Sequence, residues 1–225
     1  MRLAEIFHSI QGEGKLAGVP SVFVRASGCN LRCSWCDTPY ASWNPEGQDV
    51  PVAEIIRRLG DMQARHAVLT GGEPAIMPDL VPLCDALKSA GYHITLETAA
   101  TVFTPAAIDL ASLSPKLSNS TPAGAMAAAH ERQRLNPPVI QRFIDASPDF
   151  QLKFVVRAPA DMDEIHALLA SLADWQPSDV LLMPEGTDPA ALSQRSAWIA
   201  DVCKQTNFRF CQRLHIALFG NRRGT

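Results

Sequence analysis

Short apolar runs of strand length alternate with longer segments of helical period along this chain of 225 residues. The strand-like runs, some with the turn that follows, occupy residues 21–28, 66–74, 93–99, 108–118, 151–158 and 179–187. Such alternation is typical of a parallel α/β fold, and we predict one domain over residues 1–225 with about six parallel strands. The stretch at about 120–148 interrupts this order with Pro137-Pro138 and an alanine-rich section. We expect an irregular excursion with short helices there and assign it no chemistry.

Helical segments are predicted at 78–92, at 160–175 and after residue 188. Gly91 is the expected C-cap of the first of these helices. Asp161 and Glu164 have the spacing of a capping box at the start of the second. Asp188 followed by Pro189 is expected to open the last long helix.

Three cysteines follow the first predicted strand in the run GCNLRCSWCDT, at positions 29, 33 and 36. Iron-sulfur clusters normally bind four cysteine thiolates. Three closely spaced thiolates without a fourth nearby therefore indicate a cluster with one iron left open, whose shell a small molecule completes. The CxxxCxxC spacing is similar to that of radical S-adenosylmethionine enzymes, in which the methionine part of that cofactor binds the open iron.

Other interpretations of the cysteines are a zinc site or a disulfide framework. A structural zinc ion requires four protein ligands, and the remaining cysteines are distant in the sequence. Cys84 and Cys203 lie in apolar helical patterns and are expected in the core. For Cys211 two positions remain possible, one in the core and one beside the cluster. Six cysteines in a chain of this length, without a signal peptide, do not indicate a secreted disulfide scaffold.

Polar residues stand at the ends of successive predicted strands, where α/β barrels place reactive groups. The second strand ends in Thr70-Gly71-Gly72-Glu73-Pro74, whose glycines let the backbone approach a ligand closely. Glu97 stands at the end of the third strand and Ser114-Pro115-Lys116 at the end of the fourth. Each of these is an ordinary loop residue when taken alone. Their recurrence at neighbouring strand ends favours a shared ligand.

The segment before the first predicted strand contains SIQGEG, and the strand itself carries Arg25. Gln11, Glu13 and Arg25 supply an amide, a carboxylate and a guanidinium. Such a set can bind a heterocycle with amide-like edges, and Arg25 can bind a carboxylate through two hydrogen bonds.

The motifs SIQGEG, VFVR, GCNLRCSWCDT, LTGGEP, LET and SPK, in this order, closely resemble the 7-carboxy-7-deazaguanine synthase family. The resemblance implies a partial β/α barrel, trimmed relative to a full barrel, of the radical S-adenosylmethionine type. It also implies a carbon-nitrogen lyase that converts 6-carboxy-5,6,7,8-tetrahydropterin to 7-carboxy-7-deazaguanine with loss of ammonia, in the pathway to queuosine and related 7-deazapurines. The implied cofactors are a [4Fe–4S] cluster, S-adenosylmethionine and Mg²⁺.

The same resemblance assigns roles to individual positions. It implies that three residues bind the cluster: Cys29, Cys33 and Cys36. It implies that Thr38 binds Mg²⁺, which prefers oxygen ligands. The residues implied for S-adenosylmethionine are Gly72, Glu97, Ser114, Pro115, Lys116 and Lys153. The residues implied for the pterin are Ile10, Gln11, Gly12, Glu13, Arg25, Asp37, Thr70 and His215.

Composition excludes some functions and leaves others open. A net charge of −3 offers no basic field for a nucleic acid, and no apolar run is long enough to cross a bilayer. Oxygen-sensitive cluster chemistry and unpaired thiols indicate the reducing cytoplasm. The resemblance further implies a homodimer and an electron donor such as flavodoxin or ferredoxin.

Two alternative functions remain at this point. Activases that abstract hydrogen from a glycine of a partner protein are also small and use CxxxCxxC, although SIQGEG and Arg25 suit a small-molecule substrate better. A non-catalytic module that binds zinc or an iron-sulfur cluster is the second alternative. Metal analysis and detection of a glycine radical distinguish them.

Overall fold

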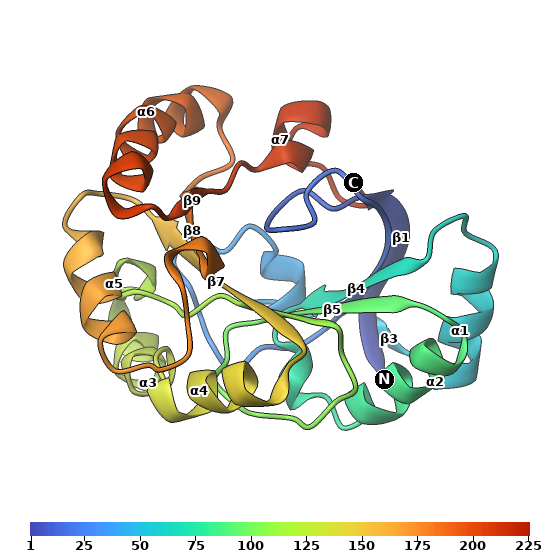
Figure 1. Cartoon of the computed structure of the whole chain (residues 1–225). Coiled ribbons are helices and arrows are strands. Elements are labelled where there is room, and N and C mark those ends of the chain that lie inside the picture. Colours follow the sequence, from blue (N-terminus) through green and yellow to red (C-terminus); the bar gives the residue numbers. More distant parts are fainter.

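A computed structural model describes all residues, 1–225, and contains one open sheet of nine strands (Figure 1). The strands are β1 (Arg2–Ile10), β2 (Pro20–Ala26), β3 (Gln48–Asp49), β4 (His66–Gly71), β5 (His93–Thr98), β6 (Leu110–Leu113), β7 (Asp149–Val156), β8 (Val180–Pro184) and β9 (Arg209–Phe210). Their order in the sheet is β3-β1-β2-β4-β5-β6-β7-β8-β9. The strands from β2 to β9 are parallel, whereas β1 is antiparallel to both of its neighbours.

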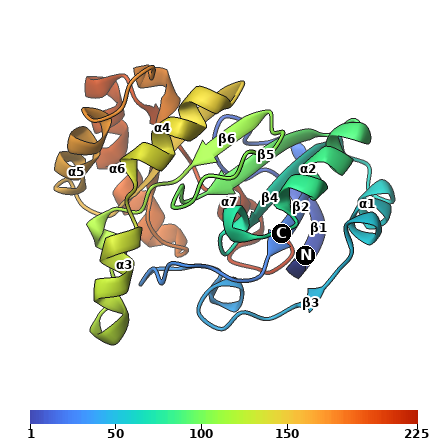
Figure 2. The ribbon, with the colours of Figure 1, turned by 90° about the horizontal axis from the view of Figure 1, so that it is seen from below.

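Seven α-helices accompany the sheet: α1 (Val52–Gly60), α2 (Leu80–Ser89), α3 (Ala127–Gln133), α4 (Pro137–Ala146), α5 (Asp161–Leu169), α6 (Pro189–Thr206) and α7 (Leu214–Phe219). Single turns of 3-10 helix occur at Pro39–Ala41, Pro74–Ile76, Ser118–Ser120, Gly124–Met126 and Pro177–Asp179. The helices from α1 to α6 form an arc around the outside of the sheet, whereas α7 lies apart from them (Figures 1 and 2).

Alternation along the strands divides the sheet into two faces. On β7, Leu152 and Phe154 belong to the main core, a cluster of 39 buried residues between sheet and helices. Lys153 and Val155, which alternate with them, line a cavity on the opposite face. On the parallel strands from β2 to β8, alternate side chains pack into the main core against the helices. On most of these strands, side chains between them face the cavity on the other side of the sheet.

The α/β fold with a partial, unclosed barrel is confirmed. The six predicted strands correspond to β2, β4, β5, β6, β7 and β8, which are all parallel. The strands at the two edges, β1, β3 and β9, were not predicted. Seven of the nine residues of β1 are exposed or only partly buried, so its sequence lacks a continuous apolar run. The short helices expected at about 120–148 are α3 and α4.

The helix boundaries agree with the local signals only in part. Asp188 is the N-cap of α6, and its carboxylate accepts a hydrogen bond from the Ala191 amide at 2.9 Å. Gly91, with φ +77°, follows the C-cap residue Ala90 and so lies one position later than predicted. The capping box at Asp161 is wrong, because Ala160 is the N-cap of α5.

The carboxylate of Asp161 has other partners. It accepts hydrogen bonds from the amides of Arg157 at 2.6 Å and Ala158 at 3.0 Å, and from Asn119 at 2.8 Å. Glu164 accepts from the Ser118 amide at 2.8 Å. Both carboxylates therefore support the loops that precede and face the helix.

His66 occupies the first position of β4, away from the cavity. Its buried imidazole lies between the hydroxyls of Ser21, 2.7 Å from Nδ1, and Thr95, 2.8 Å from Nε2. Burial and the neighbouring His93 lower the pKa of His66 to about 4. An unfolded chain takes up this proton near pH 6.5.

We therefore expect the His66 contribution to the free energy of unfolding to decrease as the pH falls from about 6.5 to about 4, because only the unfolded state binds the proton in this range. Urea denaturation across that range measures the dependence. His66→Asn, which does not titrate, should show a shallower decrease than the unsubstituted protein. Equal slopes for the two proteins would show that His66 is not the group responsible.

Candidate active site

A cavity of about 1020 Å³ lies on the face of the sheet opposite helices α1 to α6. Its lining includes every residue that the sequence predicted for a site, except Pro115. The strand alternation explains this gathering, since Arg25, Thr70, Glu97 and Lys153 all point away from the core face of their strands.

The cysteine loop follows β2 and lines one part of the cavity. Cys29 and Cys36 are half-buried and Cys33 is buried. Burial raises the pKa of Cys29 to about 12 and that of Cys33 to about 11. Without metal these side chains are therefore thiols at neutral pH. Binding of iron must displace their protons, because thiolates are the ligands.

The loop suits a cluster with several iron atoms. No three His, Cys, Asp or Glu side chains converge on a point where they could hold one metal ion. A cluster instead accepts each thiolate on a separate iron. The Cys36 sulfur lies 3.1 Å from the Ser42 hydroxyl, and the indole of Trp43 donates to the Cys33 carbonyl at 2.9 Å. These contacts orient two of the cysteines.

The glycines after β4 are required by backbone crowding. A Cβ on Gly72 would lie 2.0 Å from the Gly28 carbonyl oxygen and 2.5 Å from that of Ala41. The Gly72 amide donates to the Ala26 carbonyl at 3.1 Å, which ties this turn to the end of β2. No hydrogen bond uses the Gly72 carbonyl. The turn therefore brings a free backbone acceptor to the cavity beside the cysteine loop.

Glu73, the third residue of the GGE sequence, is fully buried and supports this turn from behind. Its carboxylate accepts hydrogen bonds from the Thr98 hydroxyl at 2.7 Å and from the amides of Ala75 and Ala99 at 3.0 and 2.8 Å. Burial raises the pKa of Glu73. The side chain does not line the cavity, so its role is to join the ends of β4 and β5.

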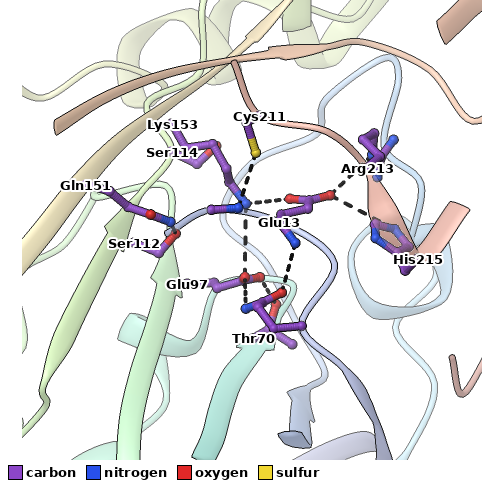
Figure 3. Close-up of polar contacts among 12 residues, drawn as sticks. Glu13, Thr70, Glu97, Ser112, Ser114, Gln151, Lys153, Cys211, Arg213 and His215 are labelled. Atoms are coloured by element: carbon purple, nitrogen blue, oxygen red, sulfur yellow. Dashed lines mark hydrogen bonds and ion pairs between the residues drawn. The ribbon is translucent and has the colours of Figure 1, made fainter. Parts of the chain in front are cut away.

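A buried group of charges forms the polar wall of the cavity (Figure 3). The Glu13 carboxylate lies 2.5 Å from Lys153 Nζ and 3.2 Å from Arg213 Nε. Burial alone would raise the pKa of Glu13, but the charges of Lys153 and Arg213 lower it well below its usual range. Burial alone would likewise lower the pKa of Lys153, but Glu13 and Glu97 raise it. All three groups are therefore charged at neutral pH.

Glu97 is the second carboxylate of this wall. It accepts hydrogen bonds from Gln11 Nε2 at 3.1 Å and from the Thr70 hydroxyl at 3.0 Å, and lies 4.0 Å from Lys153 Nζ. The sequence predicted Gln11 and Thr70 for one ligand and Glu97 and Lys153 for another. The structure places all four residues in one network around Glu97. Figure 3 labels three of them, Thr70, Glu97 and Lys153.

Arg25 is held by contacts that the sequence did not reveal. Its Nε donates to Glu5 at 2.6 Å, and its guanidinium lies over the Phe7 ring. The terminal nitrogens of the guanidinium form no hydrogen bond to the protein. Since Arg25 lines the cavity, these two groups remain available to an anionic ligand.

The other predicted residues have local partners. Lys116 Nζ donates to the carbonyl and the hydroxyl of Ser114, at 2.7 and 2.6 Å. His215 lies 4.0 Å from Glu13 and packs so closely on Gly12 that a Cβ there would come within 2.1 Å of its Nδ1. Burial lowers the pKa of His215.

Arg213 was missed by the sequence reasoning, although it connects three parts of the cavity wall. Its buried guanidinium donates to Glu13, to Asp37 beside Cys36, and to the Gly186 carbonyl. No spacing rule links Arg213 to Glu13, since they are 200 positions apart. The C-terminal residues Arg222, Arg223 and Thr225 also line the cavity.

Cys211 is buried and lies beside the cysteine loop, because Trp35 of that loop packs against the small cluster that contains Cys211. It packs in a small buried cluster with Val155, Leu181 and Met183. Its sulfur accepts a hydrogen bond from the Gly14 amide at 3.2 Å. Cys84 and Cys203 lie in the main core, as predicted.

Comparison with known proteins agrees with this architecture. A sequence profile of the Radical SAM superfamily matches residues 23–117, which contain the cysteine loop and the glycine turn. Membership of this superfamily implies a [4Fe–4S] cluster and S-adenosylmethionine as cofactors, and the protein is thus an enzyme of the radical S-adenosylmethionine class. A 7-carboxy-7-deazaguanine synthase of Halobacterium salinarum is 46% identical over 96% of this chain and 90% of its own length. One from Rhodopirellula baltica is 42% identical over 99% of this chain and 88% of its own.

The chain belongs to the 7-carboxy-7-deazaguanine synthase family, whose members are lyases. Among solved structures, QueE from Escherichia coli superposes with a TM-score of 0.72 at 27% identity, covering 95% of this chain and 94% of that one. The family and the fold predicted from the motifs are therefore confirmed. None of the helices has the length and apolar character needed to span a membrane.

Proposed function

We propose that this protein converts 6-carboxy-5,6,7,8-tetrahydropterin to 7-carboxy-7-deazaguanine with loss of ammonia, as a carbon-nitrogen lyase in queuosine biosynthesis. One observation carries the proposal: three cysteines, a polar wall of charged groups and a guanidinium with unpaired terminal nitrogens, that of Arg25, line the same cavity. Family membership supports the same reaction. The residues at each part of the cavity then have distinct tasks.

Cys29, Cys33 and Cys36 hold the cluster in this proposal. A cluster held there would supply the electron for reductive cleavage of S-adenosylmethionine, which is the source of the 5′-deoxyadenosyl radical in this class of enzyme. The Gly72 carbonyl suits the amino group of the methionine part, since it has no partner within the protein. Glu97 suits the ribose hydroxyls, and Ser114 to Lys116 complete this side of the cavity.

Thr38 is proposed as the protein ligand of Mg²⁺. Its hydroxyl lines the cavity two residues after Cys36, and its one side-chain contact is the Cys36 sulfur at 3.8 Å. Mg²⁺ keeps several waters and takes few ligands from the protein, so one hydroxyl together with the substrate carboxylate is sufficient. Bound there, the ion would fix the orientation of the substrate.

The polar wall is proposed to bind the pterin ring. Glu13 is an acceptor for ring and exocyclic N–H groups and is kept ionised by its two cationic partners. Lys153 is part of this wall rather than a separate contact to S-adenosylmethionine, because its charge is directed at Glu13. The backbone at Ile10 to Gly12, with Asp37, Thr70 and His215, encloses the same space.

Arg25 provides the test of this assignment. Arg25→Ala is expected to raise KM for the pterin about tenfold to a hundredfold, because it removes a charge-assisted pair with the carboxylate. Iron content and cleavage of S-adenosylmethionine without substrate should stay unchanged. Steady-state turnover of reconstituted protein measures the effect. Arg57→Ala, in an exposed pair on α1, is the control. An unchanged KM in Arg25→Ala would exclude the carboxylate role.

Partners and location are also part of the proposal. The free thiols of all six cysteines and the oxygen-sensitive cofactor favour the reducing cytoplasm. Flavodoxin or ferredoxin is proposed as the electron donor, and a homodimer as the active assembly, both by the family resemblance. Light scattering of the reconstituted protein tests the dimer, and turnover with each reduced carrier tests the donor.

A further inference from the structure

Residues 117–130 contact the cysteine loop from outside the cavity, and most of them belong to the stretch at about 120–148 to which we assigned no chemistry from the sequence. The Arg32 amide donates to His130 Nδ1 at 3.1 Å. The Ser34 amide donates to the Ser120 carbonyl at 2.8 Å. The indole of Trp35 donates to the Asn119 carbonyl at 3.1 Å. These contacts lie on both sides of Cys33, between the first and the last cysteine.

The loop has little structure of its own. Residues 27–38 contain no helix or strand, and their internal hydrogen bonds include a Cys36 amide to Cys33 carbonyl bond of 3.3 Å. Backbone amides need hydrogen-bond partners, and the amides of Arg32 and Ser34 find theirs in another segment of the chain. The shape of the loop therefore depends on residues 117–130.

His130 has the most constrained position in this segment. It is 2% exposed, and its Nε2 lies 2.9 Å from the hydroxyl of Ser120, which is fully buried. That hydroxyl donates to the Leu117 carbonyl at 2.6 Å, so it must accept from the N–H at Nε2. Nδ1 then carries the lone pair that the Arg32 amide needs. One neutral tautomer satisfies all these groups.

We propose that His130 is a positioning residue that fixes the cysteine loop before the cluster binds and slows loss of the cluster afterwards. It acts through the Arg32 amide and does not touch a cysteine sulfur in the structure. The inference goes beyond the proposed function, since it requires neither substrate nor turnover. Groups that orient metal ligands from outside commonly affect metal retention.

Hydrogen exchange of the metal-free full-length chain tests the first half of this proposal. His130→Ala is expected to speed exchange in peptides covering residues 31–35 about tenfold, since the Arg32 amide loses its acceptor. His130→Asn should restore much of the protection, because the side-chain oxygen of asparagine can replace Nδ1 as acceptor. The matched control is His66→Ala, which removes another buried histidine. His66 is the first residue of β4, away from the cysteine loop, and contacts the hydroxyls of Ser21 and Thr95. This variant should leave the loop unchanged.

Iron loss from the reconstituted protein to a chelator tests the second half. His130→Ala should lose iron about tenfold faster than the unsubstituted protein, and His130→Asn should lie between them. His66→Ala should match the unsubstituted protein. Equal loop exchange and equal iron loss in His130→Ala and His66→Ala would overturn the proposal, as would His130→Asn behaving like alanine in both measurements. Where His130→Ala does not fold, His130→Asn is compared with His66→Ala by the same two measurements. Faster loop exchange and faster iron loss in His130→Asn would support the proposal, and equal values would overturn it.

Discussion

Cys33→Ala is expected to abolish assembly of a stable four-iron cluster and, with it, all cleavage of S-adenosylmethionine. The sulfur of Cys33 is one of three that line the cavity, and no other cysteine of the chain lines it. A remaining pair of thiolates leaves two irons without a protein ligand. Iron content, visible absorbance and 5′-deoxyadenosine production after anaerobic reconstitution measure the loss.

Cys84→Ala is the matched control for this experiment. Cys84 is a fully buried thiol of α2 in the main core, so its replacement removes a cysteine without affecting the loop. The control should keep its iron and its activity. A Cys33→Ala protein with full cluster content and full cleavage would contradict the assignment of the three ligands.

Lys153→Met is expected to lower the free energy of unfolding of the metal-free protein by about 3–5 kcal/mol, because it leaves buried carboxylates without their nearest cation. Glu13 would retain Arg213, but that guanidinium is shared with Asp37. Methionine has a similar length, so lost packing contributes little. Urea denaturation at neutral pH measures the change.

Two further variants separate charge from packing in this wall. Lys204→Met removes a cation from an exposed pair with Asp201 and should cost less than about 1 kcal/mol. A double variant, Glu13→Gln with Lys153→Met, should be more stable than the sum of its single changes predicts, since neither charge is then left alone. A Lys153→Met protein within about 1 kcal/mol of the unsubstituted one would show that the wall contributes little to stability.

The parallel part of the fold could be predicted because most residues of its strands are buried, which gives short apolar runs bounded by turns. The alternation that places Leu152 and Phe154 in the core also directs Lys153 to the cavity, so strand-end and strand-face residues gathered as expected. Strand β1, which lies between β2 and the edge strand β3, was missed because its exposed and half-buried residues give no apolar run. The Asp161 capping box failed because nearby loop amides bind the same carboxylate.

The contacts that complete the cavity could not be predicted from spacing. Arg213 and His130 reach the site from segments far along the chain, and each resembles an ordinary surface or helix residue in sequence. The network among Glu13, Lys153 and Glu97 likewise depends on how β5, β7 and the loop after β1 pack. Sequence motifs thus located the cavity, whereas tertiary packing determined which of its residues bind each other.

The most direct test of the proposed function is a product analysis. The protein is reconstituted anaerobically with iron and sulfide and incubated with dithionite, S-adenosylmethionine, Mg²⁺ and 6-carboxy-5,6,7,8-tetrahydropterin, and the products are identified by mass spectrometry. We predict formation of 7-carboxy-7-deazaguanine with release of ammonia. Accumulation of 5′-deoxyadenosine alone, with the pterin unconsumed, would contradict the substrate, and no product of either kind from a protein with a full cluster would contradict the enzyme.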